Sequence, residues 1–273
     1  MKTETIPYRG QHLSITENGL HGSTPILFLH GNSASTQTWE KQFNSFLNDK
    51  YHLIAFDFLG FGGSSRSEQP QQDYDINSLT GSVIAVIQHF QLENYFIVGH
   101  SLGGHIIVQA LDRLHGCKGM ISIGAPPISS ALDIGKFYLP SAPTDIMFAS
   151  AFTDESLQGV EDKFYYSPEN KASFFKKDFY NTDGKAREAI GGILASNDFK
   201  NEVDVLSSNP IPKAFVNGEG ELSINNAYYD SLNFPKTWKQ RNNIIEHSAH
   251  MPHWENPDAV NLLIDEFVQA HLE

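Results

Sequence analysis

The residue of this chain best placed to do chemistry is a serine set between glycines. Ser101 lies within residues 99–104 (GHSLGG), after an apolar run of strand character at 95–98 and before a helical pattern. In that context, the pattern Gly-x-Ser-x-Gly forms a sharp turn that exposes a nucleophilic hydroxyl. Glycines lack a Cβ, so strand and helix can pack closely around such a turn. The sequence therefore predicts that Ser101 is a nucleophile at the start of a helix.

A serine hydroxyl is a weak nucleophile near neutral pH and needs a base, which an acid must orient. Of the twelve histidines, we favour His250, which lies between the last expected strand and the expected closing helix. Loops at the carboxyl ends of parallel strands gather at one end of the sheet, where Ser101 also emerges. His253 lies in the same loop and is the main alternative. His100 and His105 are too close to Ser101 in sequence, so we expect structural roles for them.

The acid is expected in the loop after the strand predicted at 213–216, where two glutamates compete. Glu221 lies beyond the turn, from where its side chain could reach back to His250, whereas Glu219 would point outward. We favour Glu221 as the orienting acid. The resulting order of nucleophile, acid and base along the chain is that of the α/β-hydrolase layout.

A negatively charged oxygen forming at the reacting carbon needs hydrogen-bond donors. Residues 30–33 (HGNS) follow an apolar strand, so the backbone N–H of Asn32 can face Ser101. The N–H of Leu102, at the start of the helix, is the second expected donor. The glycine-rich residues 57–64 lack the lysine and spacing of a phosphate-binding loop, so they are better explained as a structural turn.

Short apolar segments alternate with helical patterns through most of the chain, which predicts an α/β fold with a mostly parallel sheet covered on both faces. The expected strands are residues 11–17, 25–29, 51–56, 95–98, 119–123, 213–216 and 243–246, and the clearest helices are 77–90, 101–114 and 258–271. The alternation stops between residues 125 and 210. We therefore predict a core domain of residues 1–125 and 211–273 and an inserted helical cap of residues 126–210.

The cap segment is rich in aromatic side chains. It contains Phe137, Tyr138, Phe148, Phe152, Phe164, Tyr165, Tyr166, Phe174, Phe175, Phe179 and Tyr180. Most of these rings are expected to form the core of the cap. A few are expected to face the active site, because such caps form the roof of the pocket.

Charge and composition restrict the classes of partner. The 273 residues include 32 acidic and 19 basic side chains, a net charge of −13, which disfavours nucleic acid and anionic lipid. The single cysteine, Cys117, is expected in the core, and neither a signal peptide nor a membrane span is expected. We expect a cytoplasmic protein that acts on a small molecule without cofactor or metal. Its oligomeric state is left open.

Taken together, residues 30–32, 57–64, 99–104 and 249–257 resemble, in that order, the landmarks of α/β-hydrolase-fold esterases and lactonases. Within that fold the chain is similar to the α/β-hydrolase branch of the N-acyl-homoserine-lactone lactonases, at residues 30–33, 101–105, 124–127, 182–187 and 216–218. The resemblance implies cleavage of ester or lactone bonds through an acyl-enzyme on Ser101, and quorum quenching where the substrate is an acyl-homoserine lactone. It also implies a glutamate as the acid, in agreement with Glu221, and a cap tyrosine in contact with substrate, for which Tyr165 and Tyr166 are the candidates.

Other activities on this fold stay open. A serine at the turn argues against haloalkane dehalogenases and epoxide hydrolases, which resemble this fold but need an aspartate nucleophile. Carbon–carbon bond hydrolases and perhydrolases also use a serine, an acid and a histidine. A non-catalytic receptor that binds a small lactone and moves its cap is a further alternative, which multiple turnovers would exclude.

Overall fold

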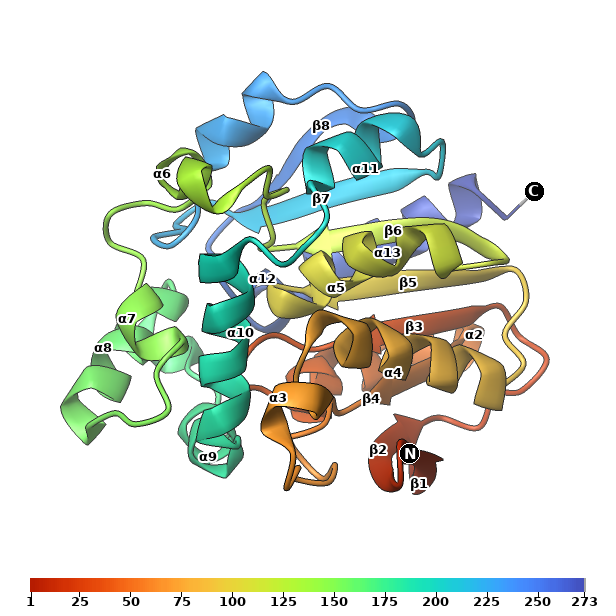
Figure 1. Cartoon of the computed structure of the whole chain (residues 1–273). Coiled ribbons are helices and arrows are strands. Elements are labelled where there is room, and N and C mark those ends of the chain that lie inside the picture. The colour runs from red at the N-terminus through yellow and green to blue at the C-terminus, as the bar shows by residue number, and fades with distance from the viewer. Residues whose placement is uncertain (273) are drawn as a thin grey trace.

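The computed structural model describes residues 1–272, in which eight strands form one sheet (Figure 1). The strands are β1 (Lys2–Tyr8), β2 (Gln11–Glu17), β3 (Pro25–Leu29), β4 (His52–Phe56), β5 (Tyr95–His100), β6 (Cys117–Ile123), β7 (Lys213–Gly218) and β8 (Thr237–Ile245). Their order across the sheet is β1-β2-β4-β3-β5-β6-β7-β8. Strands β3 to β8 are parallel, and β1 and β2 form an antiparallel hairpin at one edge. The predicted mostly parallel sheet is therefore confirmed.

Strand β1 and the first part of β8 were not predicted from the sequence. Both lie at the edges of the sheet, where one side of the strand has no neighbour. In β1 only Ile6 is buried, and the first residues of β8 are partly or fully exposed. Because few side chains of these strands enter the core, their hydropathy pattern carries little strand signal.

Helices cover both faces of the sheet. They are α1 (Glu40–Phe43), α2 (Leu47–Lys50), α3 (Pro70–Asp73), α4 (Ile76–His89), α5 (Leu102–Ala110), α6 (Ile134–Phe137), α7 (Thr144–Met147), α8 (Asp154–Phe164), α9 (Phe175–Asn181), α10 (Gly184–Ser196), α11 (Glu202–Ser208), α12 (Pro252–Glu255) and α13 (Pro257–Ala270). Short 3-10 turns occur at Thr36–Trp39, Leu111–Arg113, Ala131–Asp133, Pro168–Asn170 and Asn226–Ser231. Within residues 1–272, none of the helices has the length and apolar character needed to cross a membrane.

Successive residues of each strand point to opposite faces, which gives the sheet two separate cores. In β3, Leu27 and Leu29 belong to the core under α4, α5 and α11, whereas Ile26 and Phe28 belong to the core under α1, α2 and α13. A strand buried on both faces reads as a continuous apolar run, which is the pattern seen in the sequence.

Helices α6 to α11 all lie between β6 and β7 in the chain, in the segment predicted as the cap. Helices α7 to α10 gather at one end of the sheet (Figure 1). An apolar cluster includes side chains of α7, α8 and α9, together with Met251 from the loop after β8. Helix α11 instead packs against α5. We keep the name cap segment for residues 126–210.

Candidate active site

Ser101 occupies a strained turn between β5 and α5. Its backbone has φ 49° and ψ −116°, a conformation that residues other than glycine rarely adopt. The N–H of Ser101 donates to the carbonyl oxygen of Ile123 on β6, at 2.8 Å. A Cβ on Gly99 would lie 2.5 Å from the carbonyl carbon of Gly103, so only glycine allows the helix to pack this close. The surrounding packing therefore holds the strain in place, which is common at functional sites.

Glu221 and His250 form a buried pair. The Nδ1–H of His250 donates to Oε2 of Glu221 at 2.7 Å, and the other carboxylate oxygen accepts the backbone N–H of Ser223, also at 2.7 Å. With Nδ1 as the donor, Nε2 of a neutral His250 is left as an acceptor able to take a proton. Glu219 lies elsewhere, on the exposed side of the turn, and accepts the backbone N–H of His247 at 3.2 Å.

The backbone of His250 is held from two further sides. Its N–H donates to the carbonyl oxygen of Phe164, at the end of α8, at 3.1 Å. Its carbonyl oxygen accepts Nε2–H of His100 at 2.9 Å. Next to it, the Glu255 carboxylate accepts the N–H groups of Ala249 and Tyr166, at 2.8 and 2.7 Å. The loop that carries His250 is thus tied both to the sheet and to the cap segment.

His253 does not line the cavity that contains Ser101. It is fully buried, and its Nε2 shares a hydrogen bond with the hydroxyl of Thr38 at 2.9 Å. Its ring packs against Trp39 and His100, each at a centroid distance of 4.6 Å. Burial lowers the pKa of His253 to about 3, with His250 adding a smaller effect of the same sign. Burial thus keeps His253 neutral in the core, whereas His250 lines the cavity that contains Ser101.

Ser101, Leu102, Asn32 and His250 all line one cavity of about 110 Å³. Leu102 is the first residue of α5, so its N–H has no acceptor within the helix. The side chain of Asn32 donates to the carbonyl oxygen of Met147 at 2.6 Å, which ties the loop after β3 to α7. The turn after β4 is held by Asp57, whose carboxylate accepts the N–H groups of Thr36 and Gly63 at 2.7 and 2.8 Å. That contact fits the structural turn expected there.

The cavity is mostly apolar on its cap side. The side chains from residues 126–210 that line it are Ile128, Tyr138, Ala142, Pro143, Thr144, Met147, Phe148, Phe164, Ile190, Ile193, Leu194, Phe199 and Glu202. Three of the eleven cap aromatics considered from the sequence, Tyr138, Phe148 and Phe164, are among them. Tyr165 and Tyr166 are not: Tyr165 is buried within the apolar cluster of the cap, and Tyr166 is 49% exposed. Among the cap tyrosines considered from the sequence, Tyr138 is the one that lines the cavity.

One wall of the cavity is polar, a feature that the sequence did not predict. His105 lies one helical turn after Ser101, and its Nδ1 contacts Oε2 of Glu202 at 2.9 Å. The buried Glu202 also accepts the Nε2–H of Gln109 at 3.1 Å and the N–H of Ile128 at 2.9 Å. The only local sequence signal for this wall was the spacing of one helical turn between Ser101 and His105. Glu202 is distant in sequence, so its contact with His105 could not be predicted. These polar groups face any ligand that lies along α5.

The part of the chain that the structure describes contains one group of potential metal ligands, Glu17, His21 and His52. His52 begins β4, whereas Ser101 follows the carboxyl end of β5, so the two sites lie at opposite ends of the parallel strands.

Known proteins resemble this chain in sequence and in fold. Residues 24–257 match the alpha/beta hydrolase fold family. A putative non-heme chloroperoxidase of Synechocystis sp. is 24% identical over 94% of this chain and 95% of its own length. A variant of the N-acyl homoserine lactonase AidH, solved with N-hexanoyl homoserine lactone, superimposes with a TM-score of 0.92 at 21% identity, over 98% of each chain.

An esterase from Rhodococcus sp. superimposes with a TM-score of 0.82 at 21% identity and covers 99% of this chain and 100% of its own. At these identities the structural neighbours establish the fold and not the substrate. The family match covers most of the sequence, including Ser101, Glu221 and His250. The chain therefore belongs to the α/β-hydrolase fold family and is an enzyme of that family.

Proposed function

We propose that this protein is a serine hydrolase that cleaves carboxylic ester or lactone bonds through an acyl-enzyme on Ser101. The observation that carries the proposal is the buried hydrogen bond of 2.7 Å between Glu221 and His250, because His250 lines the same cavity as Ser101. A nucleophile, a base and an orienting acid are the groups that acyl transfer requires.

The reaction begins when His250 Nε2 takes the proton of Ser101 and Oγ bonds to the substrate carbonyl carbon. The N–H groups of Asn32 and Leu102 stabilise the oxyanion, each at a gain of about 3 kcal/mol. The carbon–oxygen bond to the leaving group then breaks, and His250 returns the proton to the leaving oxygen. In a lactone that oxygen stays attached as a hydroxyl of the acyl group. Water, deprotonated by His250, attacks the acyl carbon, the bond from that carbon to Oγ of Ser101 breaks, and His250 returns the proton to Oγ.

N-acyl homoserine lactones are the substrate class that the cavity and the relatives favour. The cap side of the cavity offers apolar groups such as Met147, Phe148 and Ile193 to an acyl chain. Ser101 and His250 also line this cavity, so a lactone whose acyl chain lies against the cap side would have its carbonyl group next to them. The lactonase AidH, whose solved structure contains N-hexanoyl homoserine lactone, supports this choice.

The test is to assay acyl homoserine lactones beside p-nitrophenyl esters and to label the enzyme with a fluorophosphonate. Wild type should turn over many times and be labelled once, and Ser101→Ala should lose both properties. Ser223→Ala, which removes another serine hydroxyl from the same cavity, should retain labelling. Labelling of Ser101→Ala would refute the nucleophile, and stoichiometric binding without turnover would favour a receptor.

Perhydrolysis is the second candidate, favoured by the similarity to a putative non-heme chloroperoxidase over nearly the whole chain. In that reaction hydrogen peroxide replaces water at the acyl-enzyme. The acyl–Oγ bond breaks, a peracid leaves, and His250 returns the proton to Ser101. Peracid formed from acetate and peroxide, and lost in Ser101→Ala, would identify this activity.

A further inference from the structure

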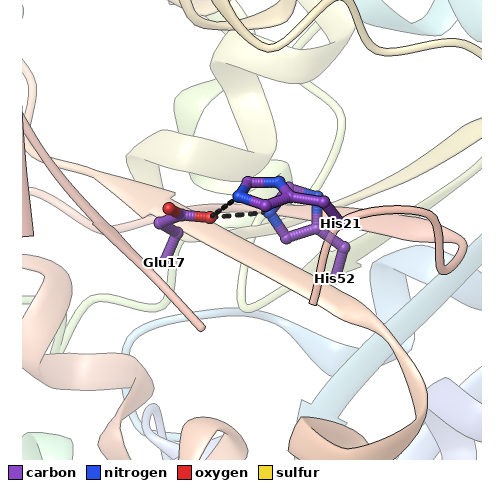
Figure 2. Close-up of side chains that lie close together, drawn as sticks. All are labelled: Glu17, His21 and His52. Carbon is purple, nitrogen blue, oxygen red and sulfur yellow. Dashed lines mark hydrogen bonds and ion pairs between the residues drawn. The ribbon is translucent and has the colours of Figure 1, made fainter. Parts of the chain in front are cut away.

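A second cluster of polar side chains lies at the opposite end of the sheet from Ser101. Glu17 is the last residue of β2, His21 lies in the turn that follows, and His52 is the first residue of β4 (Figure 2). Their side chains converge on one point, although His52 comes from a separate strand. We propose that Glu17, His21 and His52 form a binding site for a divalent transition metal, with zinc as the expected ion.

The distances between the donor atoms fit this proposal. Nε2 of His52 lies 2.8 Å and Nε2 of His21 lies 3.7 Å from Oε2 of Glu17. All three donor atoms lie within 4.8 Å of one another. Two ligands on a tetrahedral zinc ion, each about 2.0–2.2 Å from the metal, are about 3.3–3.6 Å apart. Small side-chain rotations would therefore place all three atoms around one ion.

The backbone around the cluster is preorganised by Asn18. Its side-chain nitrogen donates to the carbonyl oxygens of Asn48 and Tyr51, at 3.0 and 2.8 Å. Its side-chain oxygen accepts the N–H groups of Leu20 and Leu53, at 3.2 and 3.1 Å. These four hydrogen bonds fix the turn that carries His21 against the start of β4. A metal would thus bind without ordering a loose loop, which lowers the cost of binding.

The environment of the Glu17 carboxylate is unusual for a side chain without a function. Glu17 is 1% exposed, and among residues 1–272 its Oε1 has no hydrogen-bond partner, although Lys2 lies 3.6 Å away. Its Oε2 faces both imidazoles. A carboxylate buried in this way is costly unless a cation compensates it. An ion shared by Oε2 and the two imidazoles would supply that compensation.

The ligand types select the class of ion. Imidazole nitrogens suit zinc, copper and nickel, whereas magnesium and calcium prefer oxygen ligands. The side chain of His21 is 64% exposed, so a fourth position would be open to water. Such an ion would connect the turn after β2 to β4 and stabilise the folded chain, because it binds only when the three residues are together.

The experiment uses the untagged full chain and zinc chloride as the probe. Zinc should bind at one site per chain by calorimetry and raise the Tm by about 5 °C. His21→Ala removes an exposed ligand and leaves the fold intact. It should weaken zinc binding more than about 100-fold, which exceeds the loss expected when a residue that only hydrogen-bonds to a metal ligand is replaced. Cobalt(II) should give the visible absorption of a four-coordinate ion in wild type and lose it in His21→Ala.

Matched controls separate this site from other histidines. His115→Ala removes another exposed imidazole, outside the cluster, and should retain the full zinc response. Magnesium should leave the Tm unchanged. Lys2→Met, which removes the nearby cation, should tighten zinc binding several-fold. The proposal is overturned if zinc leaves the Tm of wild type unchanged, or if His21→Ala keeps one tight site.

Discussion

His100 and His250 are joined by a hydrogen bond of 2.9 Å, from the imidazole Nε2–H of His100 to the backbone carbonyl oxygen of His250. The two rings also pack together, with centroids 5.0 Å apart. Burial, with additional effects from His253 and His250, holds the pKa of His100 well below its usual value. His100 is therefore a neutral donor that holds the backbone of His250, the residue that we propose as the base.

We expect His100→Phe to lower kcat about 10-fold with little change in KM, because the base loses a positioning contact that matters in the transition state. His100→Gln, whose amide can donate to the same carbonyl oxygen, should recover most of the activity. Steady-state kinetics on one p-nitrophenyl ester would measure both. Equal activity of His100→Phe and wild type would show that the hydrogen bond has no catalytic effect.

Glu221→Gln is expected to lower kcat by about 10³- to 10⁴-fold, because the amide cannot hold the catalytic tautomer of His250 in the same way. The matched control is Glu219→Gln, two residues away, whose carboxylate accepts an exposed backbone N–H. It should stay within about 2-fold of wild type. The opposite ranking of these two variants would assign the acid to Glu219.

The apolar cavity predicts a dependence on acyl-chain length. Burial of one methylene is worth about 0.8 kcal/mol, so kcat/KM should rise about 4-fold per methylene until the cavity is full. Ile193→Trp, on the cavity wall, should move the optimum to shorter chains. Tyr166→Ala, at an exposed position outside the cavity lining, should leave the optimum unchanged. A flat response across a homologous series of esters would contradict this role of the cavity.

His253 predicts a specific pH dependence of stability. Its pKa is about 3 in the folded protein, below the ordinary value of 6.5. Between these values the unfolded chain binds a proton that the folded chain does not. The contribution of His253 to the free energy of unfolding therefore falls as the pH drops below 6.5, by up to about 1.4 kcal/mol per pH unit.

His253→Gln removes this titration and keeps a hydrogen-bond donor near Thr38. Its deficit in unfolding free energy relative to wild type should shrink between pH 6.5 and 4, as measured by urea denaturation. The comparison with wild type is needed because Asp57 acts in the opposite direction. Burial raises its pKa to about 7, so the folded state gains stability from its protonation as the pH falls. A constant deficit across this range would contradict the assignment.

The sequence by itself determined the fold class and the position of the turn that contains Ser101. The reason is that these signals are local. Runs such as 25–29 and 95–98 are buried on both faces and so appear as continuous apolar segments. The turn at Ser101 depends on neighbouring glycines, so six residues are enough to predict it. The order of Ser101, Glu221 and His250 along the chain follows from the fold, and their catalytic roles stay predictions that the proposed experiments test.

Only the tertiary structure decided which side chains meet. Glu219 and Glu221 differ by two positions in one turn, and the path of that turn brings only Glu221 to His250. Contacts between distant segments place Tyr138 on the cavity and Tyr166 on the surface. The same holds for the pair of His105 and Glu202 and for the cluster around Glu17. Such contacts depend on how separate elements pack, and no local pattern of residues records that packing.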